Sequence, residues 1–176
     1  MLIRYIRFIL FLVLYQLPLF CHSQGEFYQW RFGFNAGLNF NFTPPIAVVG
    51  SAMSAINVTI NQADSLGNLF FYSDGQTIWN KNNAVFQNGN GLFGGFSKQS
   101  VFLVPDRGIT NQYFLFTVGP WDIFPNMQGL FFSKVDMTLD GGLGGVITGM
   151  KNIVVPGGEN VPNGIHATRH RNNKDV

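Results

Sequence analysis

The most constraining feature of the chain is the stretch SLGNLFFYSDGQTIWNKN, residues 65–82, in which short apolar runs alternate with turn residues. Leu69–Ser73 and Thr77–Trp79 have the aromatic and β-branched composition of strands, and only Asp74, Gly75 and Gln76 separate them. Asp and Gly both tolerate a positive φ, which a tight hairpin turn requires. The stretch therefore predicts a β-hairpin with Gly75 in a left-handed conformation.

Further short strands are predicted on both sides of this hairpin. The segment 27–41 alternates aromatic and polar residues and predicts one or two strands, ended by TPP at 43–45. Ala55–Ile60 alternates with β-branched residues, which completes a three-stranded antiparallel meander over 55–79. After a Gly/Asn-rich stretch at 86–96, predicted to be a loop, a second set of strands is expected at Ser100–Val104, Tyr113–Val118 and Leu130–Val135. The chain is therefore expected to be all-β.

The two sets of strands resemble each other, with Leu69 aligned to Tyr113 at an offset of 44 positions. One β-unit repeated at this spacing is typical of propeller blades. We therefore predict antiparallel three- to four-stranded meanders forming the blades of an incomplete β-propeller over residues 24–176. Two blades would be followed by the start of a third, at Ile153–Val155 and His166–His170. Because a propeller needs about four blades to close, the sequence predicts the front of a longer protein.

The N-terminus has the layout of a secretory signal peptide, predicted to span residues 1–23. Arg4 and Arg7 precede an apolar run over 8–20, and Ser23 or Gln24 supplies the cleavage position. The run is too short to cross a hydrocarbon core of ~30 Å, so no membrane span is expected after cleavage. Lipidation of Cys21 is the alternative. The mature chain is predicted to be exported, to the cell surface or medium, or to the periplasm if no C-terminal sorting signal follows.

Charge excludes one class of function. Of the 11 basic residues two lie in the predicted signal, which leaves nine to balance the nine acidic residues. A neutral chain lacks the basic surface with which proteins neutralise phosphate backbones. No nucleic-acid partner is expected.

Several segments together resemble a known family. They are FGFNAGLNFN, GNLFFYSDGQTIWNKNNAVFQNGNGLFGG, SKQSVFLVPD, YFLFTV and FSKVDMTLDGGLGGV. In this order they look like the N-terminal region of large exported proteins of Bacteroidota, many of which end in a gliding-motility-associated sorting domain. The resemblance covers about 30–175 and implies a propeller-like domain, export by the Sec and type IX pathways, and a role in adhesion or motility.

Carboxylates were weighed as catalytic groups, because glycoside hydrolysis needs two of them on either side of one bond. Their spacing selects no pair, and Asp beside Gly or Pro usually forms turns. Sialidase chemistry would need several arginines, and only four remain after signal cleavage. The residues considered are Asp74, Asp106, Asp122, Asp136 and Asp140, with Arg31, Arg107, Arg169 and Arg171. No catalytic residue and no cofactor is predicted.

Metal and sugar sites were weighed in the same way. His166 and His170 have helical metal-pair spacing, but on a strand they would lie ~13 Å apart, so no metal ligand is predicted. DGGLGG at 140–145 lacks a phosphate-loop Lys and is expected to be a flexible connection. Trp30, Trp79 and Trp121 could stack on sugars if exposed, although packing between blades was favoured.

The sequence therefore predicts a non-enzymatic scaffold or interaction segment of a secreted or cell-surface protein, with a protein or glycan partner. Two alternatives stay open. One is a carbohydrate-binding module that uses exposed aromatic side chains. The other is the front part of a propeller hydrolase with its site beyond Val176.

Overall fold

The computed structural model describes residues 25–95, 97–120, 128–161 and 164–167. The predicted signal peptide, Asp122, Trp121, Arg169, His170 and Arg171 lie outside these ranges. No helix in the described ranges is long and apolar enough to cross a membrane.

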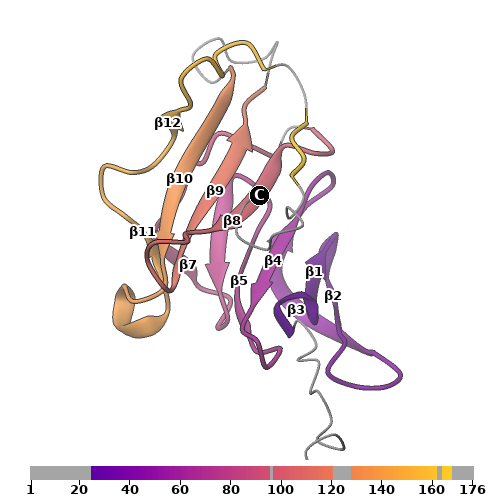
Figure 1. Ribbon diagram of the computed structural model, residues 1–176. Coiled ribbons are helices and arrows are strands. Elements are labelled where there is room, and N and C mark those ends of the chain that lie inside the picture. The colour runs from indigo at the N-terminus through magenta and orange to yellow at the C-terminus, as the bar shows by residue number, and fades with distance from the viewer. Residues whose placement is uncertain (1–24, 96, 121–127, 162–163, 168–176) are drawn as a thin grey trace, which may run out of the picture.

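The described elements form a small antiparallel sheet and a larger mixed sheet (Figure 1). After a short 3-10 helix, η1 (Gly25–Phe27), the small sheet has the order β1-β2-β3. The large sheet has the order β4-β5-β6-β7-β11-β10-β9-β8, with β12 paired to β10. The strands of the small sheet are β1 (Gln29–Phe32), β2 (Phe34–Asn39) and β3 (Ile46–Ser54); those of the large sheet are β4 (Ile60–Ala63), β5 (Leu69–Ser73), β6 (Thr77–Asn80), β7 (Val85–Asn90), β8 (Val101–Pro105), β9 (Gln112–Val118), β10 (Leu130–Asp136), β11 (Gly145–Val146) and β12 (Ile153–Val154).

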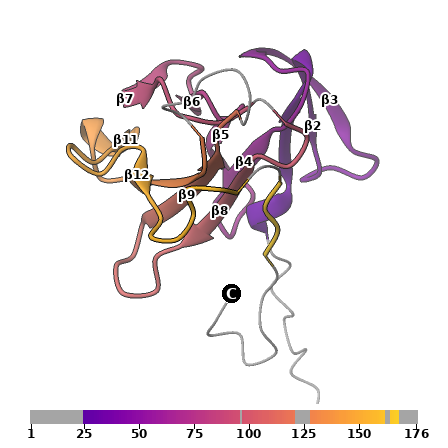
Figure 2. The same cartoon turned by 90° about the horizontal axis from the view of Figure 1, so that it is seen from above.

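The prediction of propeller blades is wrong. Blades would be separate sheets packed face to face, whereas a parallel pair between β7 and β11 joins the two predicted meanders into one sheet. That sheet curls into a nearly closed mixed barrel of eight strands, so that β8 returns towards β4 (Figure 2). β12, expected to start a third blade, pairs with β10 of the same barrel. Of the strand expected at His166–His170, only residues 166 and 167 are described, and these two are not in a strand.

The barrel encloses a single hydrophobic core drawn from both predicted meanders. Alternation along each strand turns one set of side chains inward, as Tyr113 and Leu115 show on β9 and Val135 shows on β10. Phe71 of β5 meets Phe86 of β7 at a ring distance of 5.4 Å and Tyr113 of β9 at 5.6 Å. The core cluster is completed by Ile78, Leu92, Val101, Met137 and Val146.

The predicted hairpin turn between β5 and β6 is confirmed. The Asp74 Oδ1 atom accepts hydrogen bonds from the Gln76 and Thr77 amides, at 2.9 and 2.8 Å. Ser73 Oγ accepts from the Gly75 amide and donates to the Thr77 carbonyl. Gly75 has a φ of 88°, the left-handed value predicted for it. The strands predicted at β5, β6, β8, β9 and β10 are also found, within a residue or two of their expected ends.

Three local predictions are wrong. The strand expected at Ala55–Ile60 is mostly the irregular crossing from the small sheet to the barrel, with regular strands on either side of it. The loop expected at 86–96 contains most of β7, where a positive φ at Asn88 accommodates an irregular strand. The flexible connection expected at 140–145 contains the 3-10 helix η3 (Asp140–Gly142) and the first residue of β11.

Candidate functional site

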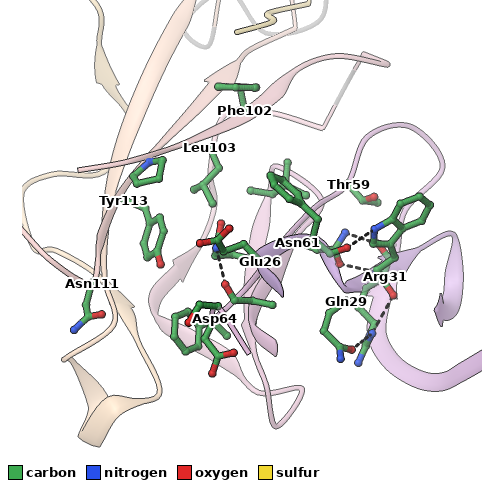
Figure 3. Close-up of a pocket in the computed structure, with 18 of the residues that line it drawn as sticks. Glu26, Gln29, Arg31, Thr59, Asn61, Asp64, Phe102, Leu103, Asn111 and Tyr113 are labelled. Atoms are coloured by element: carbon green, nitrogen blue, oxygen red, sulfur yellow. Dashed lines mark hydrogen bonds between the residues drawn. The ribbon is translucent and has the colours of Figure 1, made fainter. Parts of the chain in front are cut away.

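A cleft of about 1260 Å³ lies where the barrel fails to close. One wall comes from η1, β1 and β4, and the other from β8 and the loop that follows it (Figure 3). β4 and β8 are the two end strands of the large sheet, and they share no strand pairing. Side chains rather than backbone hydrogen bonds therefore line the seam, and the space between them is open to a ligand.

Trp30 presents a fixed aromatic surface on the first wall. Alternation along β1 buries Gln29 and Arg31 and exposes Trp30 and Phe32. The indole N–H of Trp30 donates to the Phe27 carbonyl at 2.9 Å, and its ring packs on Phe40 with centroids 4.8 Å apart. Trp30 is still 47% exposed. Since its polar atom is already satisfied, the ring offers a ligand its apolar surface.

The polar side chains beneath this wall bind one another and tie the small sheet to the barrel. Asn61 of β4 accepts from the Arg31 amide at 2.6 Å and donates to the Arg31 carbonyl at 3.2 Å. The Arg31 guanidinium donates to Gln29 Oε1 and to the Trp30 carbonyl. Burial lowers the pKa of Arg31 from its ordinary value, and the nearby Tyr72 partly offsets this. These groups support the wall rather than face a ligand.

Glu26, Asp64 and Tyr113 meet at the centre of the cleft, from η1, the end of β4 and β9. The Tyr113 ring packs edge-on against Phe71, and Figure 3 shows the side chains of Tyr113 and Glu26 in the same cleft. Burial raises the pKa of Tyr113, and the negative charges of Glu26 and Asp64 raise it further. Two negative charges therefore act on the Tyr113 hydroxyl.

Asp64 is held by the turn that leads into β5. Its Oδ1 accepts from the Leu66 and Asn68 amides at 2.9 and 2.8 Å, and its Oδ2 accepts from the Asn68 side chain at 2.9 Å. Burial alone would raise the pKa of Asp64, but the hydrogen bonds from Asn68, Leu66 and Gly67 outweigh it and hold the pKa below its ordinary value. Asp64 thus contributes charge to the cleft while serving as a turn residue.

This arrangement predicts a pH-dependent contribution of Asp64 to stability. Because its pKa is lower in the folded state, ionised Asp64 stabilises the fold above about pH 4, and the contribution is lost as the pH falls through the folded pKa. Asp64→Asn should therefore lower the melting temperature at neutral pH. In thermal melts, the difference in melting temperature between wild type and variant should narrow below about pH 4. Asp140→Asn is the control, since Asp140 is exposed and its carboxylate bonds to no described residue. An unchanged gap across this range would contradict the prediction.

The second wall combines apolar side chains with unbonded polar groups. Phe102 and Leu103 of β8 line it. Beyond β8 the cleft reaches Arg107, Thr110 and Asn111. Within the described residues, no hydrogen bond or ion pair satisfies these three side chains, so they are free to bind a ligand.

The carboxylates considered from the sequence do not come together. Asp74 lies in the β5–β6 turn and Asp140 begins η3, while Asp136 accepts from Gln112 and Thr138. Asp106 forms an ion pair with Lys134 at 2.8 Å and accepts from two loop amides.

The other residues singled out from the sequence also lie apart. His166 contacts the Phe102 ring, and the described residues contain no group of three potential metal ligands. Trp79 stacks on Tyr72 at 5.5 Å. Of the singled-out residues, Trp30, Arg31 and Arg107 reach the cleft.

Sequence analysis missed Glu26, Asp64 and Tyr113 as site residues. Glu26 lies three residues after the predicted signal peptide, Asp64 precedes a turn, and Tyr113 has the alternation of a core strand residue. No local motif links them, since their proximity results from the curl of the barrel.

Comparison of the chain with protein family models, with curated proteins and with solved structures finds no match. What the protein does must therefore be inferred from the cleft.

Proposed function

We propose that the protein is a non-enzymatic interaction module of an exported or cell-surface protein, and that its cleft binds a carbohydrate chain. The observation that carries this proposal is the Trp30 ring, exposed, held by its own hydrogen bond and bordering a large cleft. Sugar rings have apolar C–H faces that stack on aromatic rings, and an immobilised ring loses little conformational entropy on binding.

The polar groups around the cleft suit the rest of such a ligand. A sugar presents many hydroxyl groups, each of which donates and accepts hydrogen bonds. The cleft offers the Tyr113 hydroxyl, the Thr110 hydroxyl, the Asn111 amide, the Arg107 guanidinium and the Glu26 carboxylate. Such a mixture of neutral and charged groups beside an aromatic surface favours a polyhydroxyl ligand over a purely apolar one.

Binding without catalysis is supported by the state of the carboxylates. Glycoside hydrolysis needs one carboxylic acid and one carboxylate acting on the same bond. Of the two acids in the cleft, Asp64 has both oxygens bonded to its own turn and a lowered pKa, which suits neither an acid nor an unhindered nucleophile. Export of the protein is supported by the signal-like N-terminus.

Trp30→Ala tests the proposal. We expect the purified protein to bind a subset of a glycan array, and the variant to lose about tenfold or more of the affinity measured by calorimetry, because the stacking surface is gone. The melting temperature should change little, since Trp30 is about half exposed.

Phe42→Ala is the matched control, because Phe42 is an exposed aromatic residue that does not line this cleft. It should bind like the wild type. Equal losses in both variants, or no glycan bound by the wild type, would overturn the proposal.

A further inference from the structure

The centre of the cleft contains a polar group that the fold leaves without a partner. Tyr113 is only 9% exposed, and its ring is fixed against Phe71. Among the described residues none forms a hydrogen bond with its hydroxyl, which points into the cleft (Figure 3). Because the hydroxyl lines the open cleft and bonds to no described residue, it can donate a hydrogen bond to a ligand or accept one from it.

The charges around that hydroxyl indicate which ligand group fits. The charged residues that act on Tyr113 are Glu26 and Asp64, and both are acidic. Arg31 also lines the cleft, but its guanidinium already donates to Gln29 and to the Trp30 carbonyl. Arg107 also lines the cleft, from the loop after β8.

Glu26 is the acid available for direct contact. No described residue donates a hydrogen bond to its carboxylate, in contrast to Asp64, which its own turn holds. The Glu26 carboxylate and the Tyr113 oxygen line the same cleft and both can accept hydrogen bonds, and an ammonium group donates three. Hydrogen bonds between such charged partners are roughly twice as strong as neutral ones.

We infer that Glu26 and Tyr113 form a subsite for the ammonium group of an amino sugar, with Asp64 adding negative charge behind it. This inference rests on the proposed function, because the amino sugar would belong to the carbohydrate chain that stacks on Trp30. The subsite should bind an amino sugar more tightly than neutral sugars, which lack the positive charge. It should also disfavour uronic or sialic acids, which the two carboxylates repel.

Oligosaccharides that differ in the charge of their substituent test the inference. Glucosamine oligomers, their N-acetylated counterparts and glucuronate oligomers are titrated calorimetrically at about pH 6, where the amine is charged. The glucosamine oligomer should bind about tenfold more tightly than the acetylated one. Glu26→Gln should abolish that preference, and Tyr113→Phe, which keeps the ring packing, should weaken it. Glu159→Gln, at an exposed glutamate outside the cleft, should keep it.

A second measurement tests the subsite even if the oligosaccharides do not bind. The ¹³C-labelled ring signal of Tyr113 is followed by NMR during titration with methylammonium chloride, with sodium chloride at equal ionic strength as the reference. A saturable shift in the wild type that is absent in Glu26→Gln supports the subsite, and its absence from the wild type overturns it. Oligosaccharides that bind without an ammonium preference would overturn the inference and leave the proposed function standing. Failure of every oligosaccharide would overturn the proposed function instead.

Discussion

Gly75→Val should destabilise the protein by about 3 kcal/mol or more, the largest effect we expect from a single substitution in a turn. A non-glycine residue in the left-handed region costs about 1–2 kcal/mol, and more when it is β-branched. A Cβ atom on Gly75 would also lie 2.6 Å from the Gly95 amide nitrogen and clash with Val101 Cγ2. Overpacking of this kind adds about 1–3 kcal/mol. The melting temperature should fall by roughly 10 °C.

Gly157→Val separates the two causes of that effect. Gly157 has a φ of 82°, close to the 88° of Gly75, but a Cβ there would meet nothing within 4 Å. The free energy of unfolding of this variant should therefore fall only by the cost of the left-handed backbone conformation, about 1–2 kcal/mol. If both variants unfold at the same denaturant concentration, then the clash of the new side chain with Val101 and Gly95 adds nothing to the cost of Gly75→Val.

Phe71→Ala should cost about 3–5 kcal/mol and should weaken both halves of the barrel together. Phe71 is fully buried and its ring contacts Phe86 and Tyr113, so the cavity would open between β5, β7 and β9. Hydrogen exchange should accelerate at the amides of β4–β7 and of β8–β10 in parallel. Independent blades would instead show faster exchange only in the half that contains Phe71.

Phe116→Ala is the control for this substitution. Phe116 lies on the outer face of β9, partly exposed, beside Phe114 and Phe132. Its removal leaves no enclosed cavity, so we expect a loss of about 1 kcal/mol. A loss as large as that of Phe71→Ala would contradict the assignment of the core to the inner face.

Local signals in the sequence were sufficient for the hairpins. The β5–β6 turn was predictable because Ser73, Asp74 and Gly75 make its hydrogen bonds and supply its positive φ within five residues. β9 and β10 were predictable because their buried and partly exposed residues alternate, strictly on β10 and up to the last residue of β9. In both cases the information lies within one segment of chain.

The architecture was not predictable in this way. The apparent repeat at an offset of 44 positions aligns Phe71 with Leu115, and both are fully buried. The similarity therefore reflects equivalent inward positions on two strands of one barrel, not two copies of a blade. The pairing that distinguishes these arrangements, Gly145 with Gln87, involves residues with little strand propensity.

The candidate site was predictable only in part. Trp30 could be singled out because aromatic residues are evident in a sequence, and its alternation with Gln29 and Arg31 is local. Glu26, Asp64 and Tyr113 belong to three elements far apart in the chain, and each one has a plausible local role. Their convergence depends on how far the sheet curls, which no short segment specifies.

The parallel pair between β7 and β11 also bears on the order in which the chain folds. Asn88 and Val146, which bond across this pair, are 58 positions apart, whereas the hairpins close over a few residues. Closing a long loop costs more chain entropy than closing a hairpin, and that cost is met before the contacts form. The two groups of hairpins can therefore assemble early and separately, and we expect their union through β7 and β11 to be the late, rate-limiting event. Since the cleft is created by that union, a chain with both hairpin groups formed still has no binding site until this last step is complete.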